Sequence, residues 1–403
     1  MQARSIHDLD IAGKRVFVRV DFNVPIENGT IGDDTRIRSS LATIEAVLSR
    51  KPAVLLLASH LGRPKGEAKE EFSLAPVAKR LEELIGRKVT FAADCVGDAA
   101  KKAIAAAGGG GPEGEPGIVL LENLRFHKGE EKNDPAFAKQ LAALADVYIN
   151  DAFGAAHRAH ASTEGIVKLV KDAAAGLLME AELRHLGAAV NTPDRPFVAI
   201  LGGAKVSDKI EVIENLLPKV DVLLVGGAMA YTFFKAQGLP VGKSLVEDAS
   251  LDTARDVLKR AAARPEMRFL LPVDHIVAPK LAAGAPAAVM HVDDPAIGDR
   301  MGLDIGPETI RQFSAAIRSA KTVIWNGPMG VFEIDAFAAG TMAIAQAVAD
   351  VGGTTIIGGG DSIAAVTKAG VTDRITHIST GGGASLEFLG GQKLPGVEAL
   401  SHA

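Results

Sequence analysis

Short apolar runs recur along the whole chain, and a longer stretch with helical periodicity follows most of them. The runs are apolar almost throughout rather than alternating, which is typical of parallel strands that helices cover on both faces. The predicted strands span residues 15–20, 53–58, 117–121 and 146–149 in the first half, and 197–201, 220–225, 268–271, 322–325, 354–357 and 376–378 in the second. This alternation predicts an α/β protein built on parallel sheets.

The chain has 403 residues, more than the usual ~100–200 of one domain, so the pattern predicts two doubly wound, Rossmann-like parallel-sheet domains. A helical pattern at 177–190 ends before Pro193 and Pro196, which cannot continue a helix. We expect a first domain over residues 1–175, an interdomain helix with a hinge at 176–190, and a second domain over 191–390. Further helices are predicted at 34–48, 74–84, 135–144, 209–216, 254–263, 307–319 and 340–349.

Charge and cysteine content exclude several classes of protein. The formal net charge is -5, which argues against a chain built to neutralise nucleic-acid phosphates. Cys95 is the only cysteine, so no internal disulfide or cysteine-based metal site is expected, and the thiol favours a buried apolar role in a reducing cytoplasm. No apolar signal segment opens the sequence and no run of about 18 apolar residues occurs, so neither export nor a membrane span is predicted.

Two phosphate-binding motifs occur in the wrong context. Gly109, Gly111 and Gly114 match the dinucleotide pattern G-x-G-x-x-G, but they follow a helical pattern rather than a strand, and Pro112 lies among them. Residues 238–244 (GLPVGKS) are similar to a phosphate loop but are one residue short and lack a preceding strand. We interpret both segments as surface loops.

Arginines occur at or just after the strand ends of the first half. Ligands of open α/β sheets bind beyond the carboxyl ends of the strands, where these side chains converge. A single arginine at such a point could simply pair with a nearby carboxylate. Several together predict a cleft that clamps a small polyanion through bidentate bonds. The arginines are Arg19, Arg63, Arg125 and Arg158, joined by Arg36 at the start of the first long helix.

Histidines give a weaker signal than the arginines. His127, His157 and His160 each favour a packed or surface role, because an isolated histidine usually has one. His60 is the exception, since it lies between Ser59 and Arg63 on a strand-end turn.

Glycine-rich turns take the place of arginines in the second half. Residues 202–209 (GGAKVSDK), 358–362 (GGGDS) and 379–385 (STGGGAS) each lead from a strand into a helix, where bare backbone N–H groups can meet phosphate oxygens. Residues 226–229 (GGAM) and 325–333 (WNGPMGVFE) offer walls for a purine and a ribose. One Gly-Gly after a strand often reflects only tight packing, but five such strand ends predict a nucleotide site.

A polyanion site on one domain and a nucleotide site on the other predict phosphoryl transfer, which needs positioning and charge neutralisation. Lys205, Mg²⁺ held by Asp361, and the helix N-termini at Gly360 and Gly382 could share the charge of the transferred group. No obvious general base accompanies them. An acceptor that is already an anion, such as a carboxylate, needs none.

These motifs together resemble those of the phosphoglycerate kinase family, and the match runs in order from about Arg15 to about Leu389. The motifs are 18–25 (VRVDFNVP), 59–64 (SHLGRP), 121–127 (LENLRFH), 156–160 (AHRAH), 202–209, 325–333 and 358–362. The resemblance implies reversible transfer of a phosphoryl group between 1,3-bisphosphoglycerate and ADP, giving 3-phosphoglycerate and ATP in glycolysis or gluconeogenesis. It also implies in-line transfer after domain closure, Mg²⁺ bound as MgATP or MgADP, a monomer, and a tail, 391–403, that returns to the first domain.

The resemblance assigns residues to two half-sites. The acid would lie on the first domain, against Asp21, Phe22, Asn23, Arg36, His60, Leu61, Gly62, Arg63, Arg125 and Arg158. The nucleotide would lie on the second, against Gly203, Lys205, Lys209, Gly227, Gly302, Leu303, Asn326, Glu333, Gly358, Gly359, Gly360, Asp361 and Ser362, with Asp361 as the metal ligand. The implied catalytic set is Lys205, Arg36, Gly360 and Gly382. Lys205 would meet the transferred phosphoryl group, Lys209 the nucleotide phosphates and Glu333 the ribose.

Other classes of protein remain open at this point. An NAD-dependent dehydrogenase would need G-x-G-x-x-G after a strand and an acidic residue about 20 positions on, and neither occurs. A non-enzymatic two-domain anion-binding protein of the periplasmic type would need an export sequence. A catalytically silent relative is disfavoured by the presence of Lys205, Asp361 and Arg36 together.

Overall fold

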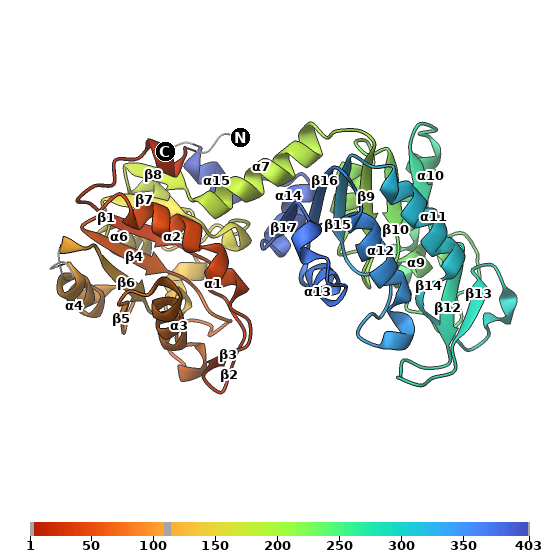
Figure 1. Ribbon diagram of the computed structural model, residues 1–403, viewed down its shortest axis with the longest axis horizontal. Helices are drawn as coiled ribbons and strands as arrows, with labels where there is room; N and C mark the ends of the chain where they lie inside the picture. The colour runs from red at the N-terminus through yellow and green to blue at the C-terminus, as the bar shows by residue number, and fades with distance from the viewer. Residues whose placement is uncertain (1–3, 109–113, 402–403) are drawn as a thin grey trace. The chain divides into compact units, whose positions relative to one another are not determined.

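The structure is a computed structural model that describes residues 4–108 and 114–401. Gly109, Gly111 and Pro112 of the rejected glycine motif lie outside these residues. By internal contacts the chain forms two compact units, Met1–Leu183 with Lys393–Ala403, and Arg184–Gln392. We call them the N-terminal and the C-terminal unit (Figure 1). Over the described ranges, no helix has the length and apolar character needed to cross a membrane.

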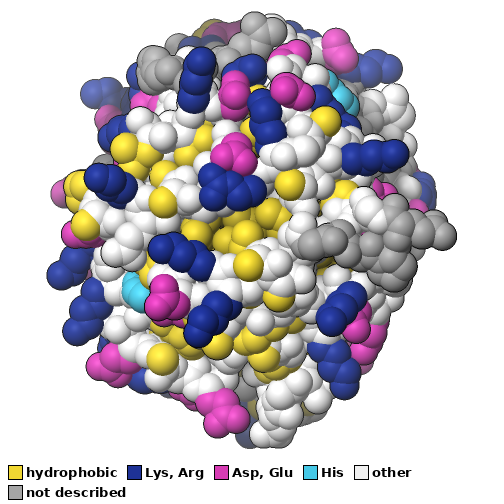
Figure 2. All heavy atoms as spheres, turned by 90° about the vertical axis from the view of Figure 1, so that its left-hand side faces the viewer, with side chains coloured by type: hydrophobic (Ala, Val, Ile, Leu, Met, Phe, Trp, Pro, Cys, Tyr) yellow, Lys and Arg dark blue, Asp and Glu magenta, His cyan; other side chains and the backbone are white. Residues whose placement is uncertain are grey.

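One face of the molecule is shown in Figure 2, and it belongs to the side that carries α4 (Gly97–Ala107) in Figure 1. Lys and Arg side chains are interspersed there with Asp and Glu, and yellow apolar atoms lie between them. No single sign of charge covers this face, in keeping with the modest net charge of -5.

The N-terminal unit is built on a parallel sheet whose strand order is β5-β6-β4-β1-β7-β8. The strands are β1 (Arg15–Arg19), β4 (Val54–Ala58), β5 (Thr90–Ala92), β6 (Gly117–Leu121), β7 (Val147–Asn150) and β8 (Asp172–Ala175), and a small antiparallel hairpin pairs β2 (Ile26–Glu27) with β3 (Thr30–Ile31). The sequence predicted β1, β4, β6 and β7. It missed the short edge strands β5 and β8.

Helices surround this sheet. They are α1 (Thr35–Ser39), α2 (Leu41–Leu48), α3 (Ala75–Ile85), α4, α5 (Lys128–Glu131), α6 (Pro135–Ala142) and α15 (Pro395–Leu400), with 3₁₀ turns η1 (Ile6–Asp8), η2 (Glu70–Phe72), η4 (Leu124–Phe126), η5 (Phe153–Ala155) and η6 (Gly165–Lys168). The single helix predicted at 34–48 was wrong in one respect: it is divided into α1 and α2 at Ser40. Ser40 N donates to Ile37 O at 3.2 Å, three residues back, so the turn tightens there.

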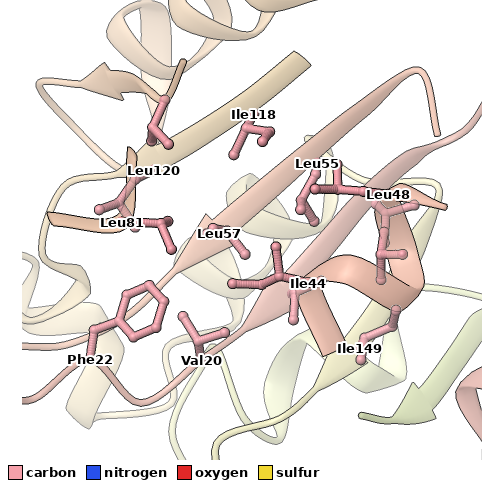
Figure 3. Packing of buried hydrophobic residues seen from close by; sticks show 14 of the residues in the cluster. Val20, Phe22, Ile44, Leu48, Leu55, Leu57, Leu81, Ile118, Leu120 and Ile149 are labelled. Carbon is pink, nitrogen blue, oxygen red and sulfur yellow. The ribbon is translucent and has the colours of Figure 1, made fainter. Parts of the chain in front are cut away.

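One face of the N-terminal sheet packs against α2 and α3. Figure 3 shows Leu55 and Leu57 of β4 near Ile118 and Leu120 of β6, in the same cluster as Ile44 of α2. Each of these five side chains is at most 2% exposed. Burying one aliphatic side chain of this size stabilises a fold by about 1.5–3 kcal/mol, so this layer fixes the sheet that carries the basic loops.

The helix α7 (Leu177–Asn191) begins in the N-terminal unit and ends in the C-terminal unit. Its start is fixed by Asp151, which follows β7. Asp151 Oδ1 accepts hydrogen bonds from Leu178 N at 2.9 Å and Met179 N at 3.3 Å, so the carboxyl group caps free backbone donors of the first turn.

The C-terminal unit contains a second parallel sheet, of strand order β11-β10-β9-β15-β16-β17. Its strands are β9 (Phe197–Leu201), β10 (Val222–Val225), β11 (Arg268–Leu270), β15 (Thr322–Asn326), β16 (Thr354–Gly358) and β17 (His377–Ser379). All six were predicted. The fold class of two parallel-sheet domains is thereby confirmed.

A three-stranded antiparallel sheet, β13-β12-β14, was not predicted. It consists of β12 (Asp274–Ala278), β13 (Ala288–His291) and β14 (Met301–Ile305). The helices of this unit are α8 (Ile210–Leu216), α9 (Met229–Ala236), α10 (Leu251–Ala262), α11 (Pro307–Arg318), α12 (Ala339–Ala349), α13 (Gly360–Lys368) and α14 (Gly383–Leu389), with 3₁₀ turns η7 (Asp248–Ser250), η8 (Pro295–Ile297), η9 (Asp335–Phe337) and η10 (Thr372–Arg374).

Each parallel sheet has one point at which the strand order reverses direction. It lies between β1 and β7 in the N-terminal unit and between β9 and β15 in the C-terminal unit. Loops beyond the carboxyl ends of strands diverge at such a point and leave a crevice for a ligand. Predicted site residues follow each of these four strands, namely Asp21 after β1, Arg158 after β7, Lys205 after β9 and Glu333 after β15.

Candidate active site

Arg36 and Asp21 form the best-defined ion pair of the N-terminal site. Arg36 Nη1 lies 2.9 Å from Asp21 Oδ2, and the Asp21 side chain is 10% exposed whereas that of Arg36 is 34% exposed. Asp21 follows β1 and Arg36 lies in α1, so the pair joins two segments at one edge of the sheet. The carboxylate orients the guanidinium while leaving other N–H donors for a ligand.

A second set of contacts ties three loops together. Asn23 Oδ1 accepts from Gly62 N at 2.8 Å, and Arg125 Nη1 donates to Gly62 O at 2.8 Å. Arg125 Nε is buried with no hydrogen-bond partner, 3.6 Å from Glu131 Oε1. Burial lowers the pKa of Arg125, but the guanidinium stays charged at any physiological pH. The predicted Asn23, Gly62 and Arg125 therefore do lie together.

His60 lies among these cations and is 5% exposed. Burial, together with the charges of Arg19, Arg125 and Arg36, lowers the pKa of His60 well below its usual range. The imidazole is therefore neutral near pH 7.

The structure separates the remaining sequence-predicted residues of this site into two groups. Arg63 and Arg158 are exposed, and Arg158 Nε donates to His157 Nε2 at 3.1 Å. The side chains of Phe22 and Leu61 lie instead in the hydrophobic core, at 0% and 4% exposure. Their backbone donors are also engaged, since Phe22 N donates to Ser59 Oγ at 2.8 Å and Leu61 N donates to Asn123 Oδ1 at 3.2 Å.

In the C-terminal unit, a cavity of about 700 Å³ lies beyond the ends of β9, β15, β16 and β17. Its lining brings together most of the predicted phosphate-binding residues. They are Gly203, Lys205, Lys209, Asn326, Gly359, Gly360, Asp361, Ser362 and Gly382. Gly358 ends β16 directly before this set. Gly360 is the first residue of α13, and Gly382 precedes α14, as the sequence predicted.

Close backbone approach explains why glycine occupies the start of this cavity. A Cβ built on Gly202 would lie 2.1 Å from Pro328 O and 2.5 Å from Gly327 O. Gly202 N also donates to Asn326 O at 2.9 Å, so the loops after β9 and β15 are joined by their backbones. Any side chain at residue 202 would force the two loops apart.

Lys209 is the buried cation of this cavity. Its Nζ donates to Asn326 Oδ1, and Asn326 Nδ2 is buried with no hydrogen-bond partner. Burial lowers the pKa of Lys209 to about 8, although Asp208 and Asp361 oppose the shift. Lys205 is exposed on the same loop. One lysine is thus fixed inside the cavity and another is free to follow a ligand.

A smaller cavity of about 230 Å³ shares Gly203 and Asp361 with the first. Gly227, Gly302, Leu303 and Glu333 line it, as predicted for the purine and ribose. Sequence reasoning missed several other lining residues, among them Tyr231, His275 and Asp304. Tyr231 Oη lies 2.8 Å from His275 Nδ1, and burial raises the pKa of Asp304 to about 7. His275 and Asp304 belong to the antiparallel sheet, so no strand-end signal could reveal them.

The N-terminal unit has a cluster of arginines, which includes Arg36 and Arg125, beyond the ends of its parallel strands. The C-terminal unit has a glycine-lined cavity with two lysines at the corresponding place. Together these sites define the class of two-domain α/β phosphotransferases. The family model for phosphoglycerate kinase matches residues 6–392, and the chain belongs to this family.

Relatives and solved structures agree with this assignment. The phosphoglycerate kinase of Acidobacterium capsulatum is 59% identical over 411 residues, and that of Solibacter usitatus is 58% identical over 407, with 100% of each chain covered in both cases. The solved phosphoglycerate kinase from Coxiella burnetii has a TM-score of 0.89 at 43% identity, covering 100% of this chain and 99% of its own. The one from Pyrococcus horikoshii OT3 has a TM-score of 0.83 at 32% identity, covering 99% and 98%.

The chain is therefore a glycolytic kinase. It transfers a phosphoryl group between 1,3-bisphosphoglycerate and ADP, giving 3-phosphoglycerate and ATP. The alternatives of an NAD-dependent dehydrogenase and a non-enzymatic anion-binding protein find no support in these comparisons.

Proposed function

We propose that the N-terminal unit binds 3-phosphoglycerate or 1,3-bisphosphoglycerate and that the C-terminal unit binds MgATP or MgADP. The observation that carries this proposal is the cavity of about 700 Å³ in which Lys205, Lys209 and Asp361 lie beside glycine-rich turns. Lysine side chains and free backbone N–H groups are the donors that phosphate oxygens prefer. The neighbouring cavity of about 230 Å³ has the room and the lining for a purine.

The acid has a phosphate and a carboxylate, and the N-terminal unit offers guanidinium groups for both. Arg36 is oriented by Asp21, and Arg125 is oriented by Gly62 O and carries a buried Nε with no partner. Arg63 and Arg158 are exposed near the ends of β4 and β7 and can move to the ligand. Asn23 and His60 supply uncharged groups beside them.

We assign the transfer step to residues of both units. Lys205 would follow the transferred phosphoryl group, and the backbone N–H groups at Gly360 and Gly382 would stabilise charge on its oxygens. Arg36 would hold the acid in line with it. No residue is needed as a general base, because the attacking carboxylate already carries the electron pair and has no proton to lose.

Closure of the two units would bring the half-sites together and exclude water, which would otherwise hydrolyse an acyl phosphate. We expect the motion to use the helix at 177–190 and the turns at Gly202 and Gly381 as hinges.

The oxygen ligands near the nucleotide phosphates fit Mg²⁺. Asp361 is exposed at the lip shared by the two cavities, and a hard cation takes one carboxylate together with phosphate oxygens. Mg²⁺ would there neutralise phosphate charge.

A monomer, a cytoplasmic location and the absence of nucleic-acid binding stay predictions, and the tail 391–403 is proposed to complete the acid-binding domain.

The test is ADP formation from MgATP with and without 3-phosphoglycerate, with a downstream reductase to remove the acyl phosphate. Turnover that depends on the acid supports the proposal. Nucleotide binding without such turnover would mean that the acceptor is wrong, and equal turnover in the absence of the acid would contradict the assignment of the basic cluster.

A further inference from the structure

Four polar side chains of the N-terminal unit are buried and linked to one another by hydrogen bonds. They are Glu130 of α5, Ser162 in the segment after η5, Arg19 at the end of β1, and His60 after β4. Glu130, Ser162 and Arg19 are 0% exposed and His60 is 5% exposed. Polar groups buried to this extent are costly unless each is hydrogen-bonded, so the arrangement requires a structural or functional reason.

The four groups are joined by short hydrogen bonds. Ser162 Oγ lies 2.6 Å from Glu130 Oε1, and Ser162 N donates to Glu130 Oε2 at 3.0 Å. Arg19 Nε donates to the same Ser162 Oγ at 2.8 Å, and Arg19 Nη2 lies 3.1 Å from His60 Nδ1. The guanidinium is therefore held on one side by the serine and directed at the imidazole on the other.

The direction of the last hydrogen bond follows from chemistry alone. A guanidinium has only donors and does not lose its proton in a protein. His60 Nδ1 must therefore accept from Arg19, so Nδ1 carries no proton and the imidazole bears its single proton on Nε2. This result is the same whichever of Glu130 and Ser162 holds the proton between them.

Alternation along β1 explains why Arg19 is not one of the arginines that face the ligand. Val16 and Val18 point into the core cluster against α2, so Phe17 and Arg19 lie on the opposite face of the sheet, where the Phe17 and Tyr148 rings are 6.0 Å apart. With no exposed surface, Arg19 cannot reach a ligand. The sequence grouped it with Arg36, Arg63, Arg125 and Arg158, and the structure corrects that grouping.

We propose that Arg19, anchored by Ser162 and Glu130, is a positioning residue that fixes His60 as a neutral imidazole with Nε2–H directed to an oxygen of the acid substrate. The substrate part of this proposal rests on the proposed function. A neutral imidazole donates a single hydrogen bond in one direction, whereas the neighbouring guanidinium groups are charged and have several N–H donors. A protonated histidine there would add a buried positive charge beside Arg19, Arg125 and Arg36.

Electrostatics favours the same state of His60. Burial and the neighbouring arginines lower the pKa of His60, while burial raises the pKa of Glu130 against the opposing effect of Arg19. The nearby His160, whose Nδ1 lies 3.9 Å from Glu130 Oε1 and lacks a hydrogen-bond partner, has a pKa lowered to about 3 by burial and by the charges of Arg125, Arg19 and Arg158. Arginine charges thus contribute to the lowered pKa values of both His60 and His160.

The first test is a long-range ¹H–¹⁵N correlation spectrum of the enzyme labelled on histidine, recorded without ligand. A neutral imidazole gives two different ¹⁵N shifts, and these identify the protonated nitrogen. The resonances of His60 are assigned with His60→Gln. We expect the Nε2–H tautomer, unchanged between about pH 6 and 8, the range in which a free histidine titrates. A Nδ1–H tautomer, or an imidazolium at pH 7, would overturn the proposal.

The second test removes the anchor and not the arginine, because a variant of Arg19 itself could fail to fold. In Ser162→Ala we expect a mixture of His60 tautomers. We also expect an increase of about tenfold in the KM for 3-phosphoglycerate, which is the loss in affinity expected when one hydrogen bond to a charged group is lost. The KM for MgATP should not change. Ser162→Thr keeps the hydroxyl and should restore both readouts, whereas Ser314→Ala, which removes a buried serine hydroxyl in α11, should alter neither.

The outcomes separate this proposal from the proposed function. Unchanged His60 nitrogen shifts in Ser162→Ala would overturn the positioning role even in a fully active enzyme. The wild-type enzyme could show the Nε2–H tautomer but no turnover that depends on the acid. In that case the proposed function is wrong, and so is the role of His60 as a donor to the acid. The conclusion that Arg19 fixes the tautomer of His60 would still hold.

Discussion

Arg36 Nη1 donates to Asp21 Oδ2 at 2.9 Å, at the edge of the N-terminal sheet where β1 ends. The pair combines the two interpretations that the sequence left open, since the arginine has a carboxylate partner and also remains 34% exposed. An ion pair at such a surface contributes little stability by itself, typically ~0–1 kcal/mol. Its value lies in the fixed direction of the remaining guanidinium donors.

Arg36→Ala should raise the KM for 3-phosphoglycerate and lower kcat, because the acid loses a positioned bidentate partner. We expect a loss of at least about tenfold in kcat/KM for the acid, with a smaller change in the KM for MgATP. Steady-state kinetics with each substrate varied in turn measures both. The matched control is Arg38→Ala on the same helix, whose guanidinium pairs with Asp34 at 2.8 Å and should be dispensable. An unchanged rate with the acid would contradict the assignment.

Lys205→Ala should reduce turnover far more than nucleotide affinity. The side chain is exposed in the free protein, so it contributes little to ground-state binding and is available to follow the transferred group. The expected loss in kcat is about 10²–10³-fold, similar to removal of one transition-state donor elsewhere. Single-turnover kinetics together with nucleotide titration separates the two effects. Equal losses in kcat and in affinity would exclude a transition-state role, and Lys243→Ala, an exposed lysine paired with Asp299, serves as the control.

Nucleotide binding should take up protons near pH 8. The pKa of Lys209 is lowered to about 8 in the free protein, mainly by burial, and phosphate oxygens beside Nζ would raise it again. Affinity should therefore fall as the pH rises through about 8, because the ammonium must be re-formed on binding. Calorimetry in buffers of different ionisation enthalpy measures the uptake. Lys209→Arg should abolish it, and a wild-type proton count of zero at pH 8.5 would sink the prediction.

Asp151→Asn should change the pH dependence of stability. Burial raises the pKa of Asp151 to about 7, so the folded protein holds a proton that the unfolded chain releases near pH 4. With more protons bound in the folded state, the free energy of unfolding contributed by this group falls as the pH rises from about 4 to 7. Asparagine keeps an acceptor for Leu178 N but cannot ionise.

The stability of Asp151→Asn relative to the wild type should thus improve between pH 4 and pH 8, by roughly 2–4 kcal/mol if the whole shift is realised. Urea unfolding at both pH values gives this difference, in which the other titrating groups cancel. A difference that is constant with pH would show that Asp151 is ionised throughout.

The sequence predicted the central strands of each sheet, and also the three-residue edge strands β11 and β17, because apolar runs followed by turn residues contain them. It missed the edge strands β5 and β8. In β8 the residues are one aspartate and three alanines, which are depleted in strands. It also missed β12, β13 and β14, whose antiparallel pairing depends on contacts that no local pattern encodes. Cys95 is buried, as expected.

The site residues were predictable as far as strand ends could indicate them. Lys209, Asn326 and Asp361 come together because the carboxyl ends of neighbouring parallel strands meet at one edge. Phe22 and Arg19 show the limit of this reasoning. Within a strand, the alternation of side chains decides whether a residue such as Arg19 faces the ligand or the interior. Beyond the strand, the direction of the loop decides this for a residue such as Phe22.

The return of the chain to the N-terminal unit has a consequence for how the protein is made. Gly396 N donates to Ala156 O at 2.9 Å, and Val397 and Leu400 of α15 are each 1% exposed. A ribosome synthesises residues 1–183 first, but the helix that covers part of this unit emerges after the entire C-terminal unit. The half of the enzyme that is begun first is therefore completed only after the other half, and a nascent chain carries an uncovered apolar surface until α15 has been synthesised.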